Sequence, residues 1–452
     1  MIRVLTSVWA LLIGVVLIML GNGMHFTLIG LRGGIEGFSS AELAIVTSGY
    51  FAGFLSGARI TPRMIKRVGH VRVFAALGSF TSAGLIAFPL IAEPWAWTAL
   101  RVILGFCMSG IYVTAESWLN DASSNETRGK VLSAYMIAQT LGIIGAQGLL
   151  TLGDAANSAL FIVASILVSI SFAPILLSAS SVPVTEAARP MGLKELFAGS
   201  PLSTVGIFLL GCVYATQTGM AAVYGTQIEM TTVQIATFVA MLFAGALVFQ
   251  YPIGWLSDRM DRRKLIFGAA AVAMSACMLG WLSGNQLVFM MCAAFVAGGM
   301  TTPLYALFLA YTNDFLSLEE MPAASGGLVL TFGVGAILGP LIAGWSMEHL
   351  GPQSFWLVLA GTFAVIAVYA LYRMTRREAL PVEETESYVS VLPTASPMAV
   401  ETAGVWAAEQ AEAAAEEAAA EEAAEEAAAE EAAAKEAEAE KAEAVEGKAP
   451  KA

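Results

Sequence analysis

Long apolar runs separated by short charged connections dominate the first 377 residues of the chain. The hydrocarbon core of a bilayer is about 30 Å thick, so an apolar run of about 20 residues predicts one membrane-spanning helix. The first run is too long for a removed signal peptide and lacks its cleavage pattern. We predict twelve spans, at residues 5–31, 41–62, 71–92, 95–119, 131–152, 157–178, 202–225, 231–256, 264–283, 286–311, 322–346 and 353–372.

The second half of this pattern repeats the first. At an offset of 193 residues Gly105 matches Gly298, and near the basic connections, at an offset of 192, Arg67 matches Arg259. Two six-helix halves related by an axis along the membrane normal are typical of carriers that bind solute between the halves. The predicted units are a first half (1–178), a cytoplasmic linker (179–201), a second half (202–377) and an acidic Ala/Glu-rich tail (378–452).

Composition supports a membrane protein. The chain is 57% hydrophobic and 13% charged, whereas a soluble domain is about 25% charged. The net charge of −13 arises in the tail, where residues 378–452 carry 20 acidic and 4 basic side chains; the body carries 16 acidic and 19 basic ones. An acidic tail on a basic body gives no support for a nucleic-acid partner.

The basic residues of the body predict its orientation. With the amino terminus in the cytoplasm, 17 of the 19 lie on the cytoplasmic side; Arg32 lies outside and Arg101 lies within the fourth span. Because cytoplasmic loops carry an excess of Lys and Arg, we predict a multi-pass protein of the cell inner (plasma) membrane with both termini in the cytoplasm.

Metal, cofactor and nucleotide chemistry find no support in the sequence. All four cysteines lie in apolar spans, as small buried residues do, and there is no His/Cys cluster at zinc spacing. A glycine-rich phosphate loop ending in Lys-Ser or Lys-Thr is also missing. We therefore expect no metal, no cofactor and no ATP-driven pump, and the lack of a nucleophile–base set argues against an enzyme.

The connection at residues 254–264 reads Gly-Trp-Leu-Ser-Asp-Arg-Met-Asp-Arg-Arg-Lys. It resembles the signature loop of the major facilitator superfamily of secondary transporters, except that Asp261 stands where that family usually has Gly. The first-half counterpart departs further, with Pro62 and Lys66 at the usual Gly and acidic positions. Glu116-Ser-Trp-Leu-Asn followed by Arg128-Gly129 is similar to the YcaD-like branch. The resemblance implies a twelve-helix facilitator whose spans one, four, seven and ten surround a cavity.

Charged contacts in these connections suggest a gate. Asp258 could accept hydrogen bonds, and the neighbouring arginines could pair with carboxylates when the cytoplasmic side is closed, which would bias the populated state. The alternative is that the cations only enforce topology. The proposed gate residues are Arg67, Gly69, Gly254, Asp258, Arg259, Arg262 and Arg263.

Polar residues inside the spans are the candidate cavity residues. Arg101, Tyr112 and Glu116 lie within about 60° of one another on a helix. A charge at membrane depth usually faces a cavity or a partner, although a rim position with a snorkelling side chain is the alternative. Arg101 could hold an anionic group and Glu116 a proton; His25 is either a structural group or a proton site. The full set is Asn22, His25, Arg101, Tyr112, Glu116, Tyr214, Gln217, Thr218, Thr302 and Tyr305.

Two further features each allow a purely structural and a functional interpretation. Gly335, Gly339 and Pro340 in span eleven allow either close packing or a hinge. The Ala/Glu repeats of residues 405–445 have no apolar stripe, so we expect a solvated helix or coil after a linker at 381–400, and a tail dispensable for folding. A partner-binding tail is the alternative.

These observations predict an all-α membrane protein that moves a small solute by alternating access, driven by a gradient, most simply of protons. Its partners would be the lipid bilayer, the solute and protons, and we expect a monomer. The alternatives are an efflux carrier for amphipathic compounds, or a membrane sensor or scaffold on a transporter frame. In the family that this chain resembles, a Gly-Pro pair in span five is associated with antiporters. Span five of this chain has no such pair, so the sequence gives drug efflux less support.

Overall fold

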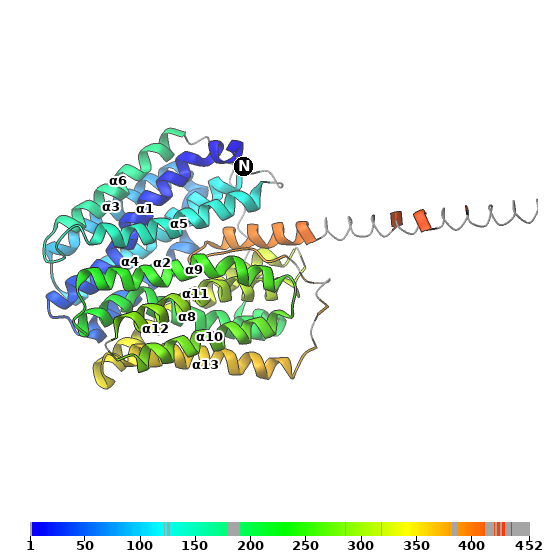
Figure 1. The fold of residues 1–452 in the computed structure, drawn as a ribbon. Coiled ribbons are helices and arrows are strands. Elements are labelled where there is room, and N and C mark those ends of the chain that lie inside the picture. Colours follow the sequence, from blue (N-terminus) through cyan, green and yellow to red (C-terminus); the bar gives the residue numbers. More distant parts are fainter. Residues whose placement is uncertain are drawn as a thin grey trace, which may run out of the picture.

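The computed structural model describes residues 2–411 except 122, 124–126, 179–189, 285, 318, 379, 382–384 and 386, together with a few isolated tail residues. Helices and short connections account for this part of the chain, which contains no strand. The predicted all-helical fold is confirmed. The elements are α1 (Ile2–Ile35), α2 (Ser40–Val68), α3 (His70–Ala87), η1 (Phe88–Leu90), α4 (Pro94–Asp121), α5 (Arg128–Leu150), α6 (Ala159–Ser178), α7 (Leu193–Gly199), α8 (Pro201–Gln227), α9 (Thr232–Ser257), α10 (Arg262–Leu282), α11 (Leu287–Asn313), α12 (Met321–Leu350) and α13 (Ser354–Met374) (Figure 1).

Eleven of the described helices are long and apolar enough to cross a membrane. The remaining predicted span corresponds to α6, of which the apolar stretch Ala159–Pro174 is shorter. The short helix α7 falls in the predicted linker; residues 179–189 of that linker, including Arg189, lie outside the described residues. The helices α1–α6 and α8–α13 thus correspond in order to the two predicted sets of six spans.

Helix starts and close helix contacts recur in both halves. Ser39 caps α2 in a reciprocal capping box with Glu42, and Thr231 caps α9 in the same way with Gln234, which satisfies otherwise free helix N–H groups. Gly69 connects α2 directly to α3 with φ +87°, a conformation that glycine adopts without steric cost. These local signals fix where the spans begin and turn.

Small residues bring helices within each half into contact. A methyl group added at Gly105 of α4 would overlap the carbonyl oxygen of Tyr50 in α2, and one added at Gly298 of α11 would overlap that of Leu242 in α9. In a bilayer, such close backbone approach is a main source of helix association because lipid is as apolar as the side chains. The two halves share this packing at repeat-equivalent positions.

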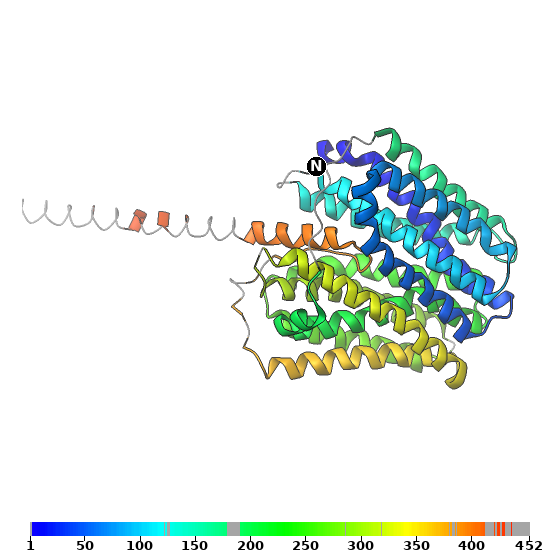
Figure 2. The same ribbon diagram turned by 180° about the vertical axis from the view of Figure 1, so that it is seen from behind.

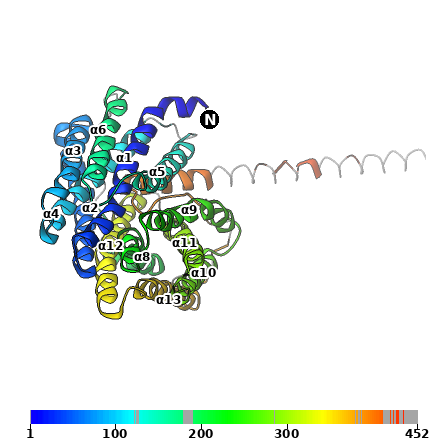
Figure 3. The ribbon, with the colours of Figure 1, turned by 60° about the vertical axis from the view of Figure 1, so that its left-hand side comes forward.

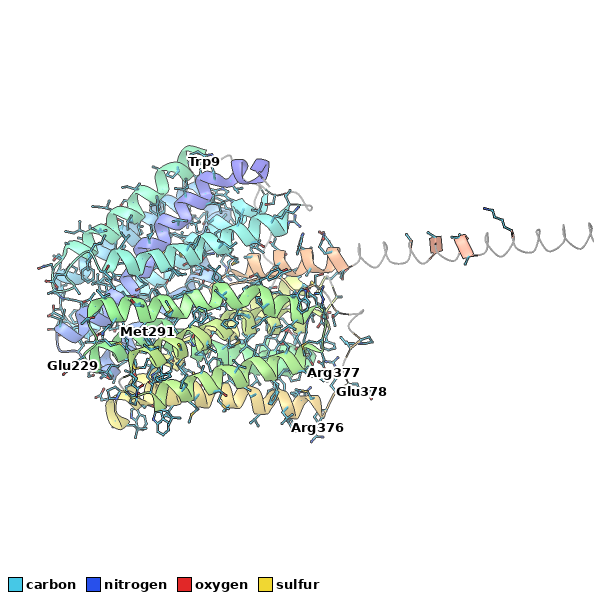
Figure 4. All side chains as sticks on the ribbon, viewed as in Figure 1. Trp9, Glu229, Met291, Arg376, Arg377 and Glu378 are labelled. Carbon is cyan, nitrogen blue, oxygen red and sulfur yellow. The ribbon has the colours of Figure 1, made fainter. Side chains whose placement is uncertain are left out.

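The bundle has two distinct ends. Arg376, Arg377 and Glu378 lie at the end where α2, α9 and α13 finish, and Glu229 lies at the opposite end (Figure 4). We call these the basic end and the far end. The charges that the sequence assigns to the cytoplasmic side cluster in the connections of the basic end.

The two halves meet at the far end. The amide N–H of Ala41 donates to a Glu348 carboxylate oxygen at 3.0 Å, and the Ser48 hydroxyl donates to the carbonyl of Ile337 at 2.8 Å. Gln227 of α8 also donates to the Ser40 hydroxyl. Because these contacts join α2 with α8 and α12, they close the bundle between its halves at this end.

The prediction that the tail offers no buried face is wrong for its first part. Residues 388–411, here called the C-terminal insert, run back into the bundle between α5 and α9 (Figures 1 to 3). Val391 is 2% exposed, and Ala395 and Ala399 are each 1% exposed. The expected linker and the start of the expected coil are therefore packed structure, whereas most of the Ala/Glu repeat beyond residue 411 lies outside the described residues.

Candidate solute cavity between the halves

A polar cavity lies between the halves, on the basic side of the far-end contacts. Its polar lining side chains come from both halves and carry no formal charge. They are Asn22 and Thr27 of α1, Tyr50 of α2, Tyr112 of α4, Gln147 of α5, Tyr214 and Thr218 of α8, and Thr394 of the insert. Phe26, Phe51 and Phe243 add aromatic surface. Such a lining can hydrogen-bond and stack on a small solute.

The structure brings together four of the predicted cavity residues: Asn22, Tyr112, Tyr214 and Thr218. The Tyr112 hydroxyl donates to the sulfur of Met19 at 3.3 Å, which holds the ring across the gap between α4 and α1. Span one, span four and span seven thus contribute to one cavity, but among the described residues its lining includes none from span ten and takes others from spans two, five and eight.

Arg101 and His25 lie beside this cavity but do not line it. The Arg101 guanidinium stacks on the Phe26 ring at 4.1 Å and on the Tyr50 ring at 4.6 Å, measured to the centroids. One of its terminal nitrogens lies 3.4 Å from His25 Nδ1. Phe26 and Tyr50 themselves line the cavity, so Arg101 supports the wall where the sequence suggested a direct solute contact.

Gln217, Thr302 and Tyr305 are also outside the central lining. Gln217 accepts a hydrogen bond from the Thr301 hydroxyl at 3.0 Å, which links α8 to α11. Tyr305 is buried with its ring against Phe332. Thr302 lines a second cavity, described below.

Glu116 lies deeper toward the basic end, where it meets the insert. One carboxylate oxygen accepts a hydrogen bond from the Tyr135 hydroxyl at 3.0 Å, and the other accepts one from the amide of Ser396 at 2.9 Å. Glu116 is 3% exposed. In this arrangement its carboxylate is bound to protein groups from α5 and the insert.

The connection between α9 and α10 contacts both the second half and the insert. Arg262 pairs with Asp314, which directly follows α11, and donates to the Ser257 hydroxyl at 3.2 Å. Arg259 stacks on the Trp255 ring at 4.4 Å. Asp258 accepts a hydrogen bond from the amide of Tyr388 at 2.8 Å, so its observed partner is the insert.

Asp261, which departs from the family pattern, caps α10. Its carboxylate accepts from the Arg263 amide at 2.9 Å and pairs with the Arg263 guanidinium at 2.8 Å. Burial alone raises the pKa of this carboxyl, but the hydrogen bonds from Arg263 and the charges of Arg263 and Lys264 outweigh it and lower the pKa below its ordinary value. Arg263 also donates to the carbonyl of Arg377 at 2.5 Å, which ties α10 to the segment after α13.

Removing this cap should weaken the second half. We expect Asp261→Ala to lower the free energy of unfolding by about 1 kcal/mol, the usual effect of losing an N-cap acceptor. Asp261→Asn keeps the acceptor and should retain most of that stability. Thermal unfolding of the two purified variants measures the difference; equal melting temperatures would show that the cap contributes nothing. Because the pKa is lowered, the charged form's contribution is present above the unfolded-state pKa and is lost as the pH falls through the folded one.

Gly335, Gly339 and Pro340 lie inside the uninterrupted helix α12. A methyl group at Gly335 would overlap the carbonyl oxygen of Phe208, and one at Gly339 would overlap that of Cys212. This face of α12 therefore packs directly on the backbone of α8.

A second cavity of about 460 Å³ lies beside the insert. It is lined mainly by apolar side chains of α5 and α9, among them Ile137, Leu247 and Trp255, with Thr302 and the insert residues Tyr388 and Trp406. Gly129 of the Arg128-Gly129 pair makes room here for the indole of Trp406.

The family model of the Major Facilitator Superfamily matches residues 11–247 and, again, 204–408. The chain belongs to this superfamily. The MFS-type transporter YcaD of Escherichia fergusonii is 26% identical over 379 residues, covering 83% of this chain and 97% of the relative. YcaD of Salmonella enteritidis is 25% identical over 357 residues, covering 78% and 92%.

Solved structures of other facilitators have the same fold. The nucleoside transporter NupG aligns with a TM-score of 0.66 at 16% identity, covering 82% of this chain and 100% of that one. A bacterial homologue of the human lysosomal transporter Spinster, in its inward-facing and unoccupied conformation, aligns with a TM-score of 0.63 at 15% identity, covering 88% and 97%. The predicted facilitator fold and the resemblance to YcaD are confirmed, and this facilitator is a membrane transporter of small molecules.

Three parts of the site were not predicted from the sequence: Thr27, Tyr50 and the insert residues. Thr27 of α1 donates to Gln147 of the adjacent α5 at 2.9 Å, a contact that the periodicity of one helix cannot reveal. For the insert a signal existed: Ser396-Pro397 is a good helix start, with a capping side chain followed by a proline at the first helical position.

Proposed function

We propose that this facilitator moves a small, uncharged polar solute across the bacterial inner membrane by alternately opening its two ends. The observation that carries the proposal is a polar cavity between halves that touch each other at the far end. Separation of the halves at the far end, with approach at the basic end, would expose the same cavity to the other side. Both termini would lie in the cytoplasm, as the positions of the basic residues indicate.

The lining indicates the class of solute. Hydroxyl and amide groups from Asn22, Gln147 and Tyr214 can pair with hydroxyl or amide groups of a solute, and Phe26 and Tyr50 offer ring faces. Arg101 and Glu116 do not line the cavity, which gives no charge to neutralise a solute ion. A neutral solute with a ring and several hydrogen-bonding groups fits these features. The driving gradient we propose is one of protons, with Glu116 as the candidate carrier once it is free of the insert.

The second cavity supports an alternative solute class. Its apolar lining between α5 and α9 suits an amphipathic compound, and such a compound would be carried outward. The two alternatives predict different ligands, which separates them in one assay.

Ligand binding and far-end locking test the proposal together. A panel of nucleosides, sugars, their charged analogues and amphipathic cations is screened for a rise in melting temperature. A ligand at 100 times its dissociation constant stabilises the folded state by about 2.7 kcal/mol. We expect a neutral polar compound to stabilise the protein and Tyr214→Ala to abolish that shift. Stabilisation by amphipathic cations alone would favour the alternative.

Transport of that compound in proteoliposomes then tests alternating access. Ser40 and Gln227 touch at the far end, so Ser40→Cys with Gln227→Cys can be oxidised to lock that end. We expect oxidation to stop transport and reductant to restore it, while each single variant is insensitive. Unchanged transport by the oxidised pair would contradict alternation at this end.

A further inference from the structure

The C-terminal insert folds as a capped helix with one apolar face. Ser396 accepts a hydrogen bond from the Ala399 amide through its hydroxyl at 3.4 Å, and its carbonyl accepts the first helical bond from Val400 at 3.1 Å. Residues 397–411 are helical. Residues three or four positions apart share a helix face, and this face is buried; its residues are Ala399, Val400, Ala403 and Ala407.

The first half binds the insert through backbone amides. The Ser396 amide donates to Glu116 of α4 at 2.9 Å, and the Leu392 amide contacts the sulfur of Met136 in α5 at 3.3 Å. Glu116 thereby places a carboxylate at the amino terminus of the insert helix, where the helix dipole favours negative charge. The carboxylate of Glu116 accepts from Tyr135 through one oxygen, and the insert supplies the partner of the other oxygen.

The second half binds the residues that precede this helix. The Tyr388 amide donates to Asp258 of the signature loop at 2.8 Å, and its hydroxyl accepts from Gln250 at 2.8 Å. The Tyr388 ring lies over Gly254, where an added methyl group would come within 2.7 Å of it. Burial and the nearby Asp258 charge raise the pKa of Tyr388, so its hydroxyl remains neutral. Gln250, Gly254 and Asp258 thus form the binding site for this tyrosine.

Both halves also touch the helical part of the insert. The indole of Trp406 lies over Gly129 of α5, 2.6 Å from the position of an added methyl group. Gly404 faces the Asn313 amide nitrogen at the end of α11, 2.7 Å from such a methyl. A helix with its side chains is about 10 Å wide, so the insert separates the two halves at the basic end.

The tip of the insert reaches the central cavity. Thr394 lines that cavity together with Tyr214. The space left is about 40 Å³, and one water occupies about 10–15 Å³ on the same measure. A few waters fit there, but a solute of the size of a sugar does not.

We propose that residues 388–411 are an autoinhibitory plug, bound at the inter-half surface formed by Glu116, Met136, Gln250, Asp258 and Asn313. While it is bound, the plug closes the cavity to solute from the basic end. It also keeps α4 and α5 apart from α11, so the basic end cannot close. Solute entry and alternation both require the plug to leave, and Glu116 and Asp258 are then released for other contacts.

Cysteine labelling of the cavity tests this without a known solute. Thr218→Cys places a thiol in the central lining, and Cys292→Ser removes the exposed native cysteine. The probe is a polar maleimide added to the purified protein in detergent. We expect a chain ending at Glu378 to label about ten-fold faster than the full chain, because the labelling rate follows the fraction of molecules with an open site. The parent without Thr218→Cys gives the background.

A cross-link in the full-length chain supplies the opposite test and does not depend on the truncated chain folding. Gly404→Cys and Asn313→Cys lie close enough for a disulfide. We expect oxidation of this pair to slow labelling of Thr218→Cys below the full-chain rate, and reductant to reverse it; the single variants should not respond. Equal labelling rates of the truncated and full chains, or of the oxidised and reduced pair, would overturn the plug. Either result leaves the proposed solute and its transport to be judged by their own assays.

Discussion

Gly335→Ala is expected to destabilise the protein strongly. The added methyl group would overlap the carbonyl oxygen of Phe208, and a backbone atom cannot rotate away as a side-chain end can. α12 must therefore move off α8, at a cost that we place at about 3 kcal/mol, the upper part of the range for overpacked cores. The melting temperature of the purified variant measures the effect.

Gly361→Ala is the matched control. Gly361 lies within the helix α13, and an added methyl group there meets nothing within 4 Å. Because alanine is the better helix former by about 1 kcal/mol, this variant should melt at or above the wild-type temperature. If Gly335→Ala also melts normally and only transport is slowed, Gly335 acts as a hinge and the packing interpretation is wrong.

Arg101→Met is expected to leave stability near wild type and to remove solute binding. Burying a guanidinium at the membrane centre destabilises the fold by about 2.5–3.5 kcal/mol. Stacking on Phe26 and Tyr50 offsets about 2 kcal/mol of this cost. Because Arg101→Met removes both the cost of burial and the stacking interaction, the two effects on the free energy of unfolding roughly cancel. The aromatic wall of the cavity, however, loses the planar group that fixes its two rings.

The measurement compares melting temperatures with and without the solute identified by the panel. Arg101→Met should melt within a few degrees of wild type but show no solute-induced rise, and Arg101→Lys should not restore it, because an ammonium group cannot stack as a planar guanidinium does. A large fall in melting temperature without solute would make Arg101 a structural residue. An unchanged solute response would remove it from the site altogether.

The spans were predictable because the bilayer imposes their length. A single strong constraint of about 20 apolar residues acts on each segment independently of its neighbours, so α8 to α13 begin and end near the predicted positions. The repeat offset of 192 also applies to the helix caps, because Ser39 and Thr231 both start helices with reciprocal capping boxes.

The cavity was predictable only in part, because side chains of neighbouring helices decide whether a given side chain reaches the cavity. The helical angle between Arg101 and Tyr112 places both on one side of α4, yet Tyr112 reaches the cavity while Phe26 and Tyr50 cover Arg101. Those rings come from α1 and α2, and no periodicity within α4 can reveal them. The sequence therefore indicated which side of α4 carries the polar residues, but it did not indicate which of them line the cavity.

The insert was missed because composition concealed its pattern. An alanine-rich segment is predicted to be solvated if burial is expected only of large apolar side chains, but Ala399, Ala403 and Ala407 are buried. Between closely spaced helices a methyl group fills the available space, so alanine there serves as a core residue. The cap at Ser396 marked the start of this helix more clearly than hydrophobicity did.

The far-end contact between the halves is made largely of small groups. Gly30 meets Ala222, Gly219 meets Thr47 and Gly344 meets Ala44. Because small groups make these contacts and lipid exerts little hydrophobic force between helices, a separation of the halves at this end would break many individually weak contacts. If the halves alternate as we propose, the far-end contact would open and reseal in one register, with a barrier set largely by a few hydrogen bonds such as that between Ser48 and Ile337.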